Sequence, residues 1–561
     1  MRREIIDFGK RIYYNILYVI VDRRNSVKRF VTVIMSAVMM LPLTACGNAD
    51  DGAGGTFYAA INANPQNLDP QMSSDSNSLS VIGNVFEGLV RIDENGAVQC
   101  AAAENYSVSS DGLTYTFQLR KGMKWSSANG FSADVTADDF VYSFRRIFDP
   151  DMLSPYTDMF ACLKNSDKVY KGTMSVADLG VKAQDEYTVV FTLEYPVSDF
   201  LYLLASPAAV PCNEEFFLAA NGRYGLAAEY CAGNGAFTLT EWNYDPYWNE
   251  NFLSLKRNSA NSSEEYRTYP SYVNYIITSD TAEYEKSSGN TFDCAVYSPE
   301  ELPKLRGKNS YEYQCAAVGL TFSKNNAMFL NNNIRYALCA ASDVSAYSGK
   351  TSEGVAPARG IFPHSVSAAG KSLREAVSEN SKPVYSEADA ITAWQRGVAE
   401  TNADLNEPVS IIVSEDFADA SEIYRTTNQW NDVLGFSCGI EILSDSDYSD
   451  RIESGDYDIA LAEVKSSRNN AADFLRCFED YIYDTEINRQ LEICIEDAER
   501  STSAAEIVAS YDKAENLVIS CGYFIPMFYE SRFLVTPSDT EGIVYDPFAE
   551  TLYFKNAKKF N

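Results

Sequence analysis

Side chains that could carry out catalysis are few in this chain of 561 residues. His364 is the single histidine, which excludes metal sites built from several imidazoles and disfavours a Ser/His/Asp arrangement. The segment SGKTS at 348–352 lacks the first glycine of a phosphate-binding loop, because Val344 stands there. The segment SDSDYSD at 444–450 lacks the glycine and the closing glutamate of a calcium loop, so we expect it to begin a helix. We therefore predict that the protein is not an enzyme and holds no metal or cofactor.

Cys46 is the residue whose surroundings indicate covalent chemistry. A basic stretch, RRNSVKR at 23–29, precedes an apolar run at 30–43 that is shorter than the roughly 20 residues of a membrane-spanning helix. This pattern is typical of a secretory signal, which we assign to residues 1–45. LTAC at 43–46 resembles a bacterial lipobox, in which the cysteine thiol is acylated and becomes the new N-terminus. Cys46 is thus predicted to be a lipid anchor; the alternative is an ordinary cysteine at this position by chance.

The segments on either side of this region carry less information. A second apolar stretch at 12–21 makes the leader unusually long, which leaves the true translation start open. Residues 46–55 are small and polar after the cysteine, and they are predicted to form a flexible tether.

The amino-acid composition of the chain limits the kinds of partner that the protein can bind. The formal net charge is −32, which makes nucleic acid or an anionic membrane surface an unfavourable partner and is explained by a solvated acidic surface. Hydrophobic residues make up 46% of a chain long enough for at least two domains. The twelve cysteines form no CxxC pair, which argues against a zinc or iron–sulfur site. Most are expected to be buried, unreactive thiols.

The first half is predicted to be rich in strands. Alternating apolar residues after a turn indicate strands at 113–119 and 187–193. Thr136 and Asp139 have the spacing of a capping box that opens a helix, and Val135 with Phe140 has the spacing of a hydrophobic staple.

The second half is predicted to repeat β-α-β units. PVSIIVSED indicates a strand, SEIYRTTNQWNDVLG a helix that ends at Gly435, and IEIL the next strand. DYSDRIESGDYDIALAEV adds a short helix and another strand. The predicted fold class is α/β with two lobes.

Many short sequence segments, each a weak signal when taken alone, follow one another in a fixed order over nearly the whole chain after residue 46. They include NPQNLDP at 64–70, VFEGLVRIDENG at 85–96, NGAFTLTEW at 234–242, LNNNIRYALCAASD at 330–343 and FIPMFYESRFLV at 524–535. This order resembles the extracytoplasmic peptide-binding lipoproteins of ABC importers, family 5 of the solute-binding proteins. The resemblance implies a periplasmic-binding-protein-like fold with a hinge and an extra subdomain in lobe I.

The resemblance also implies domain bounds. Lobe I would comprise 56–315, with an inserted subdomain at about 97–230, and lobe II would comprise 316–522. The tail, 523–561, would return to lobe I. The hinge crossovers would lie near 316–322 and 520–526, and the ligand would bind between the lobes.

The resemblance places the ligand-binding residues as well. Family peptide binders hold the ligand's ammonium with an aspartate in a W-x-A-D-Y segment, where this chain has Ser467 followed by Arg468. Asp473 or Asp75 is the alternative anchor, and Arg451 and Arg468 are candidates to attract a ligand carboxylate. The first hinge strand, which begins at Cys315, contains few of the tyrosines that we would expect to line a peptide-binding cleft. The full set of predicted ligand-binding residues is Asp75, Phe322, Arg451, Ser467, Arg468, Asn469, Asp473 and Tyr529.

The predicted function is that of a lipid-anchored, monomeric substrate-binding protein on the outer face of the cell membrane. It would capture oligopeptides and deliver them to an ABC importer permease. Two alternatives stay open: a shifted specificity for another small solute, including a sugar stacked on Trp242, Trp248 or Trp430, and a surface interaction or sensor lipoprotein. The single histidine disfavours nickel or haem as ligand.

Overall fold

The computed structural model describes residues 54–560 except 94–96, 248–250, 263–265, 290, 300, 303–304, 345–353, 378–384, 402–406 and 416–420. The predicted signal, Cys46 and most of the predicted tether lie outside the described residues. Within the described part, no helix combines the length and apolar character needed to cross a membrane.

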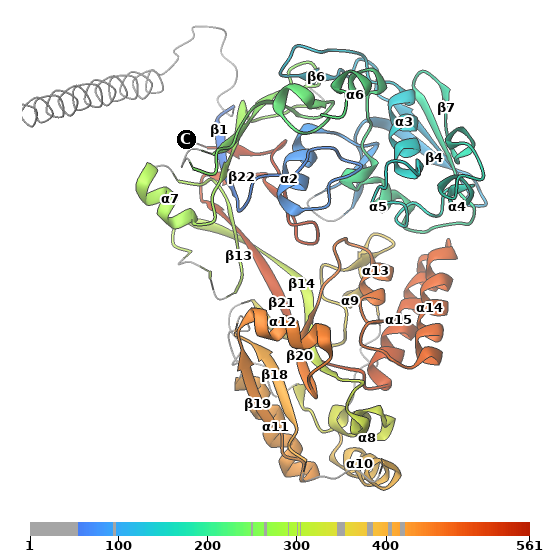
Figure 1. Ribbon diagram of the computed structural model, residues 1–561, viewed down its shortest axis with the longest axis vertical. Helices are drawn as coiled ribbons and strands as arrows, with labels where there is room; N and C mark the ends of the chain where they lie inside the picture. The colour runs from blue at the N-terminus through green and yellow to red at the C-terminus, as the bar shows by residue number, and fades with distance from the viewer. Residues whose placement is uncertain are drawn as a thin grey trace, which may run out of the picture. The chain divides into compact units, whose positions relative to one another are not determined.

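Lobe I is the part of the chain built around the first hydrophobic core (Figure 1). One of its sheets has the order β1 (Thr56–Ile61), β12 (Tyr272–Ile277), β11 (Phe252–Arg257) and β10 (Phe237–Asn243), with β1 parallel to β12. Helix α2 (Ser76–Val85) is held to the chain's tail by Asn84. The Asn84 amide donates to the Leu552 carbonyl at 2.6 Å, and its oxygen accepts from the Phe554 N–H at 2.9 Å.

A second sheet of lobe I confirms two predicted strands. Its order is β4 (Ala103–Val108), β5 (Thr114–Leu119), β8 (Thr188–Thr192) and β7 (Val181–Asp185). Tyr115, Phe117 and Leu119 point to the core, as their alternation predicted. Both sheets share one hydrophobic cluster.

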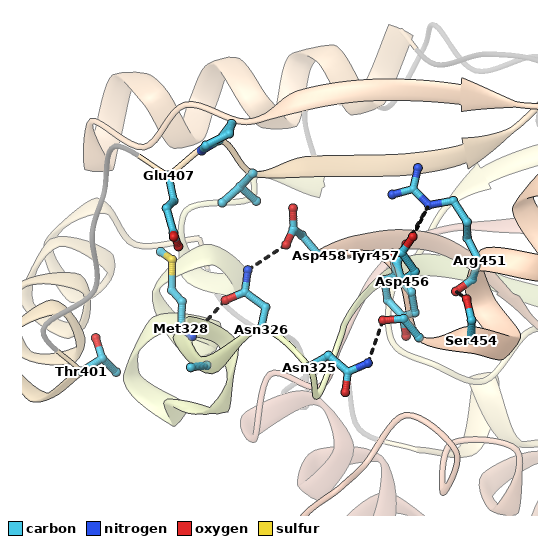
Figure 2. Close-up of a pocket in the computed structure, with 14 residues that line it drawn as sticks. Asn325, Asn326, Met328, Thr401, Glu407, Arg451, Ser454, Asp456, Tyr457 and Asp458 are labelled. Carbon is cyan, nitrogen blue, oxygen red and sulfur yellow. Dashed lines mark hydrogen bonds and ion pairs between the residues drawn. The ribbon is translucent and has the colours of Figure 1, made fainter.

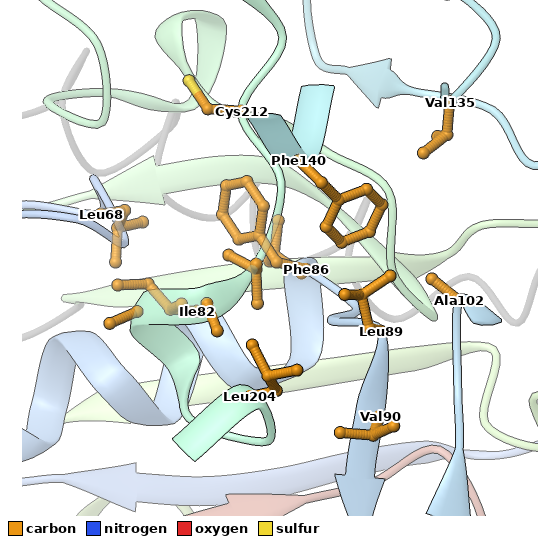
Figure 3. Packing of buried hydrophobic residues seen from close by; sticks show 14 of the residues in the cluster. Leu68, Ile82, Phe86, Leu89, Val90, Ala102, Val135, Phe140, Leu204 and Cys212 are labelled. Atoms are coloured by element: carbon orange, nitrogen blue, oxygen red, sulfur yellow. The ribbon is translucent and has the colours of Figure 1, made fainter. Parts of the chain in front are cut away.

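Helix α3 (Ala137–Phe148) begins as predicted. The Asp139 carboxylate accepts from the Thr136 N–H at 2.8 Å, which forms the capping box. Val135 and Phe140 are both buried in the core that Figure 3 shows around Phe86 and Leu89.

Two long strands run between lobe I and the rest of the chain. β14 (Lys308–Phe322) and β21 (Phe524–Pro537) pair antiparallel from Lys308 opposite Pro537 to Thr321 opposite Phe524 (Figure 1). We call the part of the chain at the Phe322 end of these strands lobe II. Its other strands extend the sheet that β14 and β21 form.

The lobe II sheet confirms the predicted β-α-β units. The order is β13 (Ala295–Tyr297), β21, β14, β20 (Ile459–Val464), β18 (Ser410–Ser414) and β19 (Gly439–Leu443), and β15 (Val355–Pro357) also pairs with β21. β18 is parallel to β19 and to β20. Helix α11 (Ser421–Leu434) ends before Gly435, which has a φ of +68°. Helix α12 (Asp445–Ser454) begins at the capping residue Ser444.

Helices cover both faces of this sheet. The core on one face includes residues of α8 (Asn332–Ala340), α10 (Glu387–Thr401) and α11. The core on the other face includes residues of α13 (Ala471–Arg476), α14 (Thr485–Arg500) and α15 (Ala504–Ser520). Because strand side chains alternate, Ala317 joins one core and Val318 the other.

Shorter elements complete the described chain. The remaining helices are α4 (Ser166–Tyr170), α5 (Phe200–Leu204), α6 (Glu214–Ala220), α7 (Thr281–Ser288), α9 (Leu373–Ala376), η1 (Val176–Asp178), η2 (Pro207–Ala209), η3 (Ala228–Tyr230) and η4 (Ala327–Leu330). The remaining strands are β2 (Val90–Ile92), β3 (Val98–Cys100), β6 (Ser126–Ser127), β9 (Ala232–Gly233), β16 (Ser367–Ala368), β17 (Lys371–Ser372), β22 (Thr540–Glu541), β23 (Val544–Asp546), β24 (Thr551–Tyr553) and β25 (Lys558–Lys559).

The eleven described cysteines are unpaired. Seven are buried, and burial raises the pKa of Cys162, Cys212 and Cys339 to about 12. Thiols with so high a pKa are poor nucleophiles, in agreement with the unreactive thiols that we predicted.

Candidate functional site

A tight turn follows the carboxyl end of β20, the end of a strand at which open α/β sheets bind ligands. The Arg468 carbonyl accepts from the Ser466 hydroxyl at 2.6 Å and from the Asn470 N–H at 2.8 Å. Asn470 then caps α13, with its side-chain oxygen accepting from the Asp473 N–H at 2.9 Å. These bonds hold the exposed Ser467 and the partly buried Arg468 at the tip of the turn.

Arg468 and Asp473 form an ion pair. Arg468 Nη2 lies 2.6 Å from Asp473 Oδ2, and Arg476 Nη1 lies 4.0 Å from the other oxygen. Burial raises the pKa of Asp473, while the two arginines act in the opposite direction. Arg468 Nη1 is buried and has no hydrogen-bond partner among the described residues. The turn therefore presents a guanidinium with spare donor capacity, and the Asp473 carboxylate is already occupied.

Lobe I contributes Asp75 and Tyr156. Asp75 caps α2, where its carboxylate accepts from the Ser78 N–H at 2.9 Å. Tyr156 donates its hydroxyl to the Ser73 carbonyl. Burial raises the pKa of Tyr156 to about 12, the positive charge of Arg468 opposes this shift, and the negative charge of Asp75 adds to it. Both charges thus act on one tyrosine hydroxyl, although Arg468 belongs to lobe II and Asp75 to lobe I.

Asn469 is partly buried and bonds to another segment of lobe II. Its side-chain oxygen accepts from the Ser367 N–H at 3.0 Å and from the Ser367 hydroxyl at 3.1 Å. Asn469 therefore positions the β16–β17 hairpin beside the turn. Of the predicted residues, the turn brings together Ser467, Arg468, Asn469 and Asp473, while Asp75 lies in lobe I at the start of α2.

Two further predicted residues are occupied by internal contacts of lobe II. Phe322 is 2% exposed and lies in the core, with its ring 5.0 Å from that of Phe329. The Tyr529 hydroxyl donates to the Gly360 carbonyl at 3.0 Å and accepts from the Arg359 N–H at 3.1 Å. Strand periodicity turns Phe322 toward the core, and the bonds of Tyr529 brace the loop that contains Arg359 and Gly360.

Arg451 lies at the opposite end of β20 from Arg468. It pairs with Glu441 at 2.7 Å and donates to the Asp456 carbonyl at 2.7 Å, at the rim of a hollow of about 850 Å³ (Figure 2). Asn326 and Asp458 also line this hollow and are bonded to each other at 2.8 Å. Because the hollow lies before the amino ends of β18 and β20 and its polar groups already bond to each other, we place the site at the turn instead.

The structure also brings together residues that the sequence did not indicate. The Ser198 N–H of lobe I donates to the Glu499 carbonyl of lobe II at 2.9 Å, and Asn470 Nδ2 donates to Asp199 Oδ2 at 3.4 Å. Lys465 pairs with Glu550 of the tail at 2.6 Å. No local pattern distinguishes Asp199 from any residue that precedes a short helix, so sequence reasoning had no signal for this contact.

Comparison with known proteins finds relatives over most of the chain. Residues 97–480 match the family model for bacterial extracellular solute-binding proteins, family 5. The oligopeptide-binding protein OppA of Bacillus subtilis is 26% identical over 570 residues, covering 94% of this chain and 99% of the relative. The dipeptide-binding protein DppE of the same organism is 24% identical, covering 88% and 90%.

Two solved structures show the fold. Unliganded, open MppA, a periplasmic murein tripeptide-binding protein, superposes with a TM-score of 0.69 at 21% identity, covering 91% of this chain and 99% of that one. OppA of Haemophilus influenzae in complex with RPPGFSPFR gives a TM-score of 0.64 at 23% identity, with the same coverage. These likenesses confirm the predicted two-lobed α/β fold.

Proposed function

The chain belongs to the bacterial extracellular solute-binding proteins, family 5, and from this premise we propose that it captures peptides between its two lobes for an ABC importer. The resemblance found in the sequence is thereby confirmed. The family consists of binding proteins rather than enzymes. Relatives named for oligopeptide and dipeptide binding, and the Haemophilus influenzae structure with a bound peptide, support peptides over the alternative ligands.

One observation carries the placement of the ligand: the turn of Arg468, whose buried Nη1 has no partner among the described residues, lies where Asn470 of lobe II contacts Asp199 of lobe I. A peptide has a positive and a negative terminus, so a site with opposite charges on facing lobes suits it. Strand addition would satisfy the peptide backbone, and wet pockets would accept varied side chains.

The ligand's ammonium is not held as in the family pattern. Ser467 carries no charge, and Asp473 is neutralised by Arg468 and Arg476. Arg468 would instead receive a ligand carboxylate, with Asp75 as the carboxylate nearest to the ligand's ammonium. Ser467 and Asn469 would contact the ligand backbone or keep the turn in shape.

Lobe closure would report occupancy to the permease. β14 and β21 connect the lobes, so bending near 316–322 and 520–526 would bring 56–315 and 523–561 against 316–522. A ligand that contacts both lobes only after closure favours the closed state.

Cys46 would anchor the protein to the outer face of the membrane. The basic and apolar segments before it support export, and the small polar residues after it would serve as the tether. We propose a monomer that works with the membrane-embedded permease subunits.

Native mass spectrometry tests the proposed function. The chain from Gly47 onward would be purified gently, and molecules released by collisional activation would be sequenced. We expect a ladder of short peptides. A spectrum that stays free of bound molecules after exposure to peptide mixtures would contradict peptide capture.

A matched pair of variants tests the proposed role of Arg468 in binding the ligand carboxylate. Arg468→Ala should weaken peptide affinity about tenfold to a hundredfold, because a hydrogen bond to a charged group is lost. Arg489→Ala removes an exposed arginine that, among the described residues, forms an ion pair with its helix neighbour Glu486 alone, and it should bind as the wild type does. Titration calorimetry with one peptide isolated from the ladder distinguishes the two. Equal affinity of all three proteins would remove Arg468 from the site while leaving peptide capture intact.

A further inference from the structure

Asp199 is a carboxylic acid buried at the contact between the lobes. The residue is 3% exposed and directly precedes α5 of lobe I. Oδ2 accepts from Asn470 Nδ2 of lobe II at 3.4 Å, and the adjacent Ser198 N–H donates to the Glu499 carbonyl of lobe II at 2.9 Å. Separation of the lobes at this contact would therefore expose Asp199 to water.

The charged groups that face Asp199 are mainly acidic. Glu499 of α14 and Asp473 of α13 both repel a negative charge on it. The nearby arginines are engaged elsewhere: Arg476 pairs with Glu492 at 2.8 Å and with Glu499 at 3.2 Å, and Arg468 pairs with Asp473. The tyrosines whose hydroxyls feel the Asp199 charge are Tyr115 of β5, Tyr202 of α5 and Tyr511 of α15. Among the described residues, Asp199 has no ion pair with a cationic side chain.

Unsatisfied polar atoms gather at this contact. Buried side-chain atoms without a hydrogen bond here are Ser198 Oγ, Asp199 Oδ1, Arg468 Nη1 and Tyr511 OH, whereas Asp473 Oδ2 is held in its ion pair with Arg468. Such atoms are costly unless a proton, a water molecule or a rearrangement supplies a partner. A protonated Asp199 carboxyl becomes a donor in a neighbourhood that holds unsatisfied acceptors.

We propose that Asp199 is a proton-binding latch between the lobes: its protonated carboxyl permits the contact of 198–199 with α13 and α14, and its ionisation loosens that contact. Nothing in this step depends on which ligand the protein carries. Protons would thereby adjust how readily the lobes separate, through a contact that includes Asn470 at the end of the ligand-binding turn.

The direction of the pH effect follows from linkage. Burial, with smaller contributions from the negative charges of Glu499 and Asp473, raises the pKa of Asp199 to about 7. After separation the carboxyl meets water, and its pKa returns to about 4. The joined arrangement thus binds a proton that the separated one releases, so the contact weakens as the pH rises from about 4 to about 7. The pKa values of Asp473 and Glu499 are also raised by burial, so a variant must isolate the contribution of Asp199.

Small-angle X-ray scattering of the ligand-free chain at pH 5.5 and pH 8 tests the latch. Asp199→Asn keeps the shape and the acceptor for Asn470 but cannot ionise. The matched control is Asp167→Asn, which removes an exposed carboxylate of lobe I that pairs with Lys171. We expect the radius of gyration of the wild type and of the control to increase at pH 8, and that of Asp199→Asn to stay at its pH 5.5 value. An equal increase in all three proteins would overturn the proposal.

Hydrogen exchange of the wild type provides a test that needs no variant. After correction for the intrinsic pH dependence of exchange, protection of the Ser198 N–H should fall about tenfold or more between pH 5.5 and pH 8. The reason is that each pH unit below the raised pKa changes the equilibrium constant of the contact by up to tenfold. Protection of β5 in the lobe I core should be unchanged. Constant protection of Ser198 would also overturn the proposal.

Discussion

At the scale of single residues, one buried ion pair of lobe II joins segments that are distant in the sequence. Arg374 and Glu515 are 9% and 0% exposed and lie 2.8 Å apart. Glu515 also accepts from the Ile361 N–H at 2.7 Å, so it fixes the loop that Tyr529 braces. Breaking such a pair leaves an uncompensated charge in the interior, which costs far more than loss of a surface pair.

Glu515→Gln should lower the free energy of unfolding by about 3 kcal/mol, because Arg374 stays buried without its counter-charge. Urea denaturation measures this change. The control, Glu486→Gln, removes the partner of the exposed Arg489 and should cost less than about 0.5 kcal/mol. Equal costs for the two variants would contradict the argument.

At the scale of elements, the β14–β21 pair is closely packed at one glycine of β14. Gly319 sits where the two strands approach closely: a Cβ there would lie 2.4 Å from the Ile525 carbonyl oxygen and 2.6 Å from the Phe524 ring. Only glycine leaves room for both. The close approach lies beside the predicted hinge, so its packing bears on how the lobes move.

Gly319→Ala should destabilise the protein by about 1 to 3 kcal/mol, because the strands must shift to accept the methyl group. Thermal or urea unfolding measures the loss. Gly439→Ala, in β19, is the matched control, since its Cβ would meet no atom closer than 3.7 Å. The prediction fails if Gly319→Ala is as stable as this control.

At the scale of the whole molecule, charge is the dominant long-range feature. The net charge of −32 places many like charges on one surface, and their mutual repulsion opposes the compact state. Mobile ions screen charges that lie more than about 10 Å apart at 0.1 M salt. Stability should therefore depend on ionic strength more strongly than in a protein of balanced charge.

Raising sodium chloride from about 0.02 M to about 0.3 M should raise the midpoint temperature of unfolding by a few degrees, because screening relieves the repulsion. Differential scanning calorimetry at fixed pH measures the shift. Sucrose of equal osmolarity serves as an uncharged comparison and separates screening from general solute effects. A midpoint that is unchanged or lowered by salt would refute the role assigned to charge.

The sequence by itself determined the local elements and the family. Alternation identified β5, the Thr136–Asp139 spacing identified the start of α3, and Gly435 marked the end of α11, because each depends on neighbours within a few residues. The order of many short segments identified the family even though no single segment did.

Only the tertiary structure decided which candidates meet. Arg451 and Arg468 are close in sequence, but they lie at opposite ends of β20, and only Arg468 faces lobe I. Asp199 meets its hydrogen-bond partner Asn470 from 271 residues away in the sequence. Burial and partner charges set the behaviour of these groups, and both come from long-range packing that local patterns do not encode.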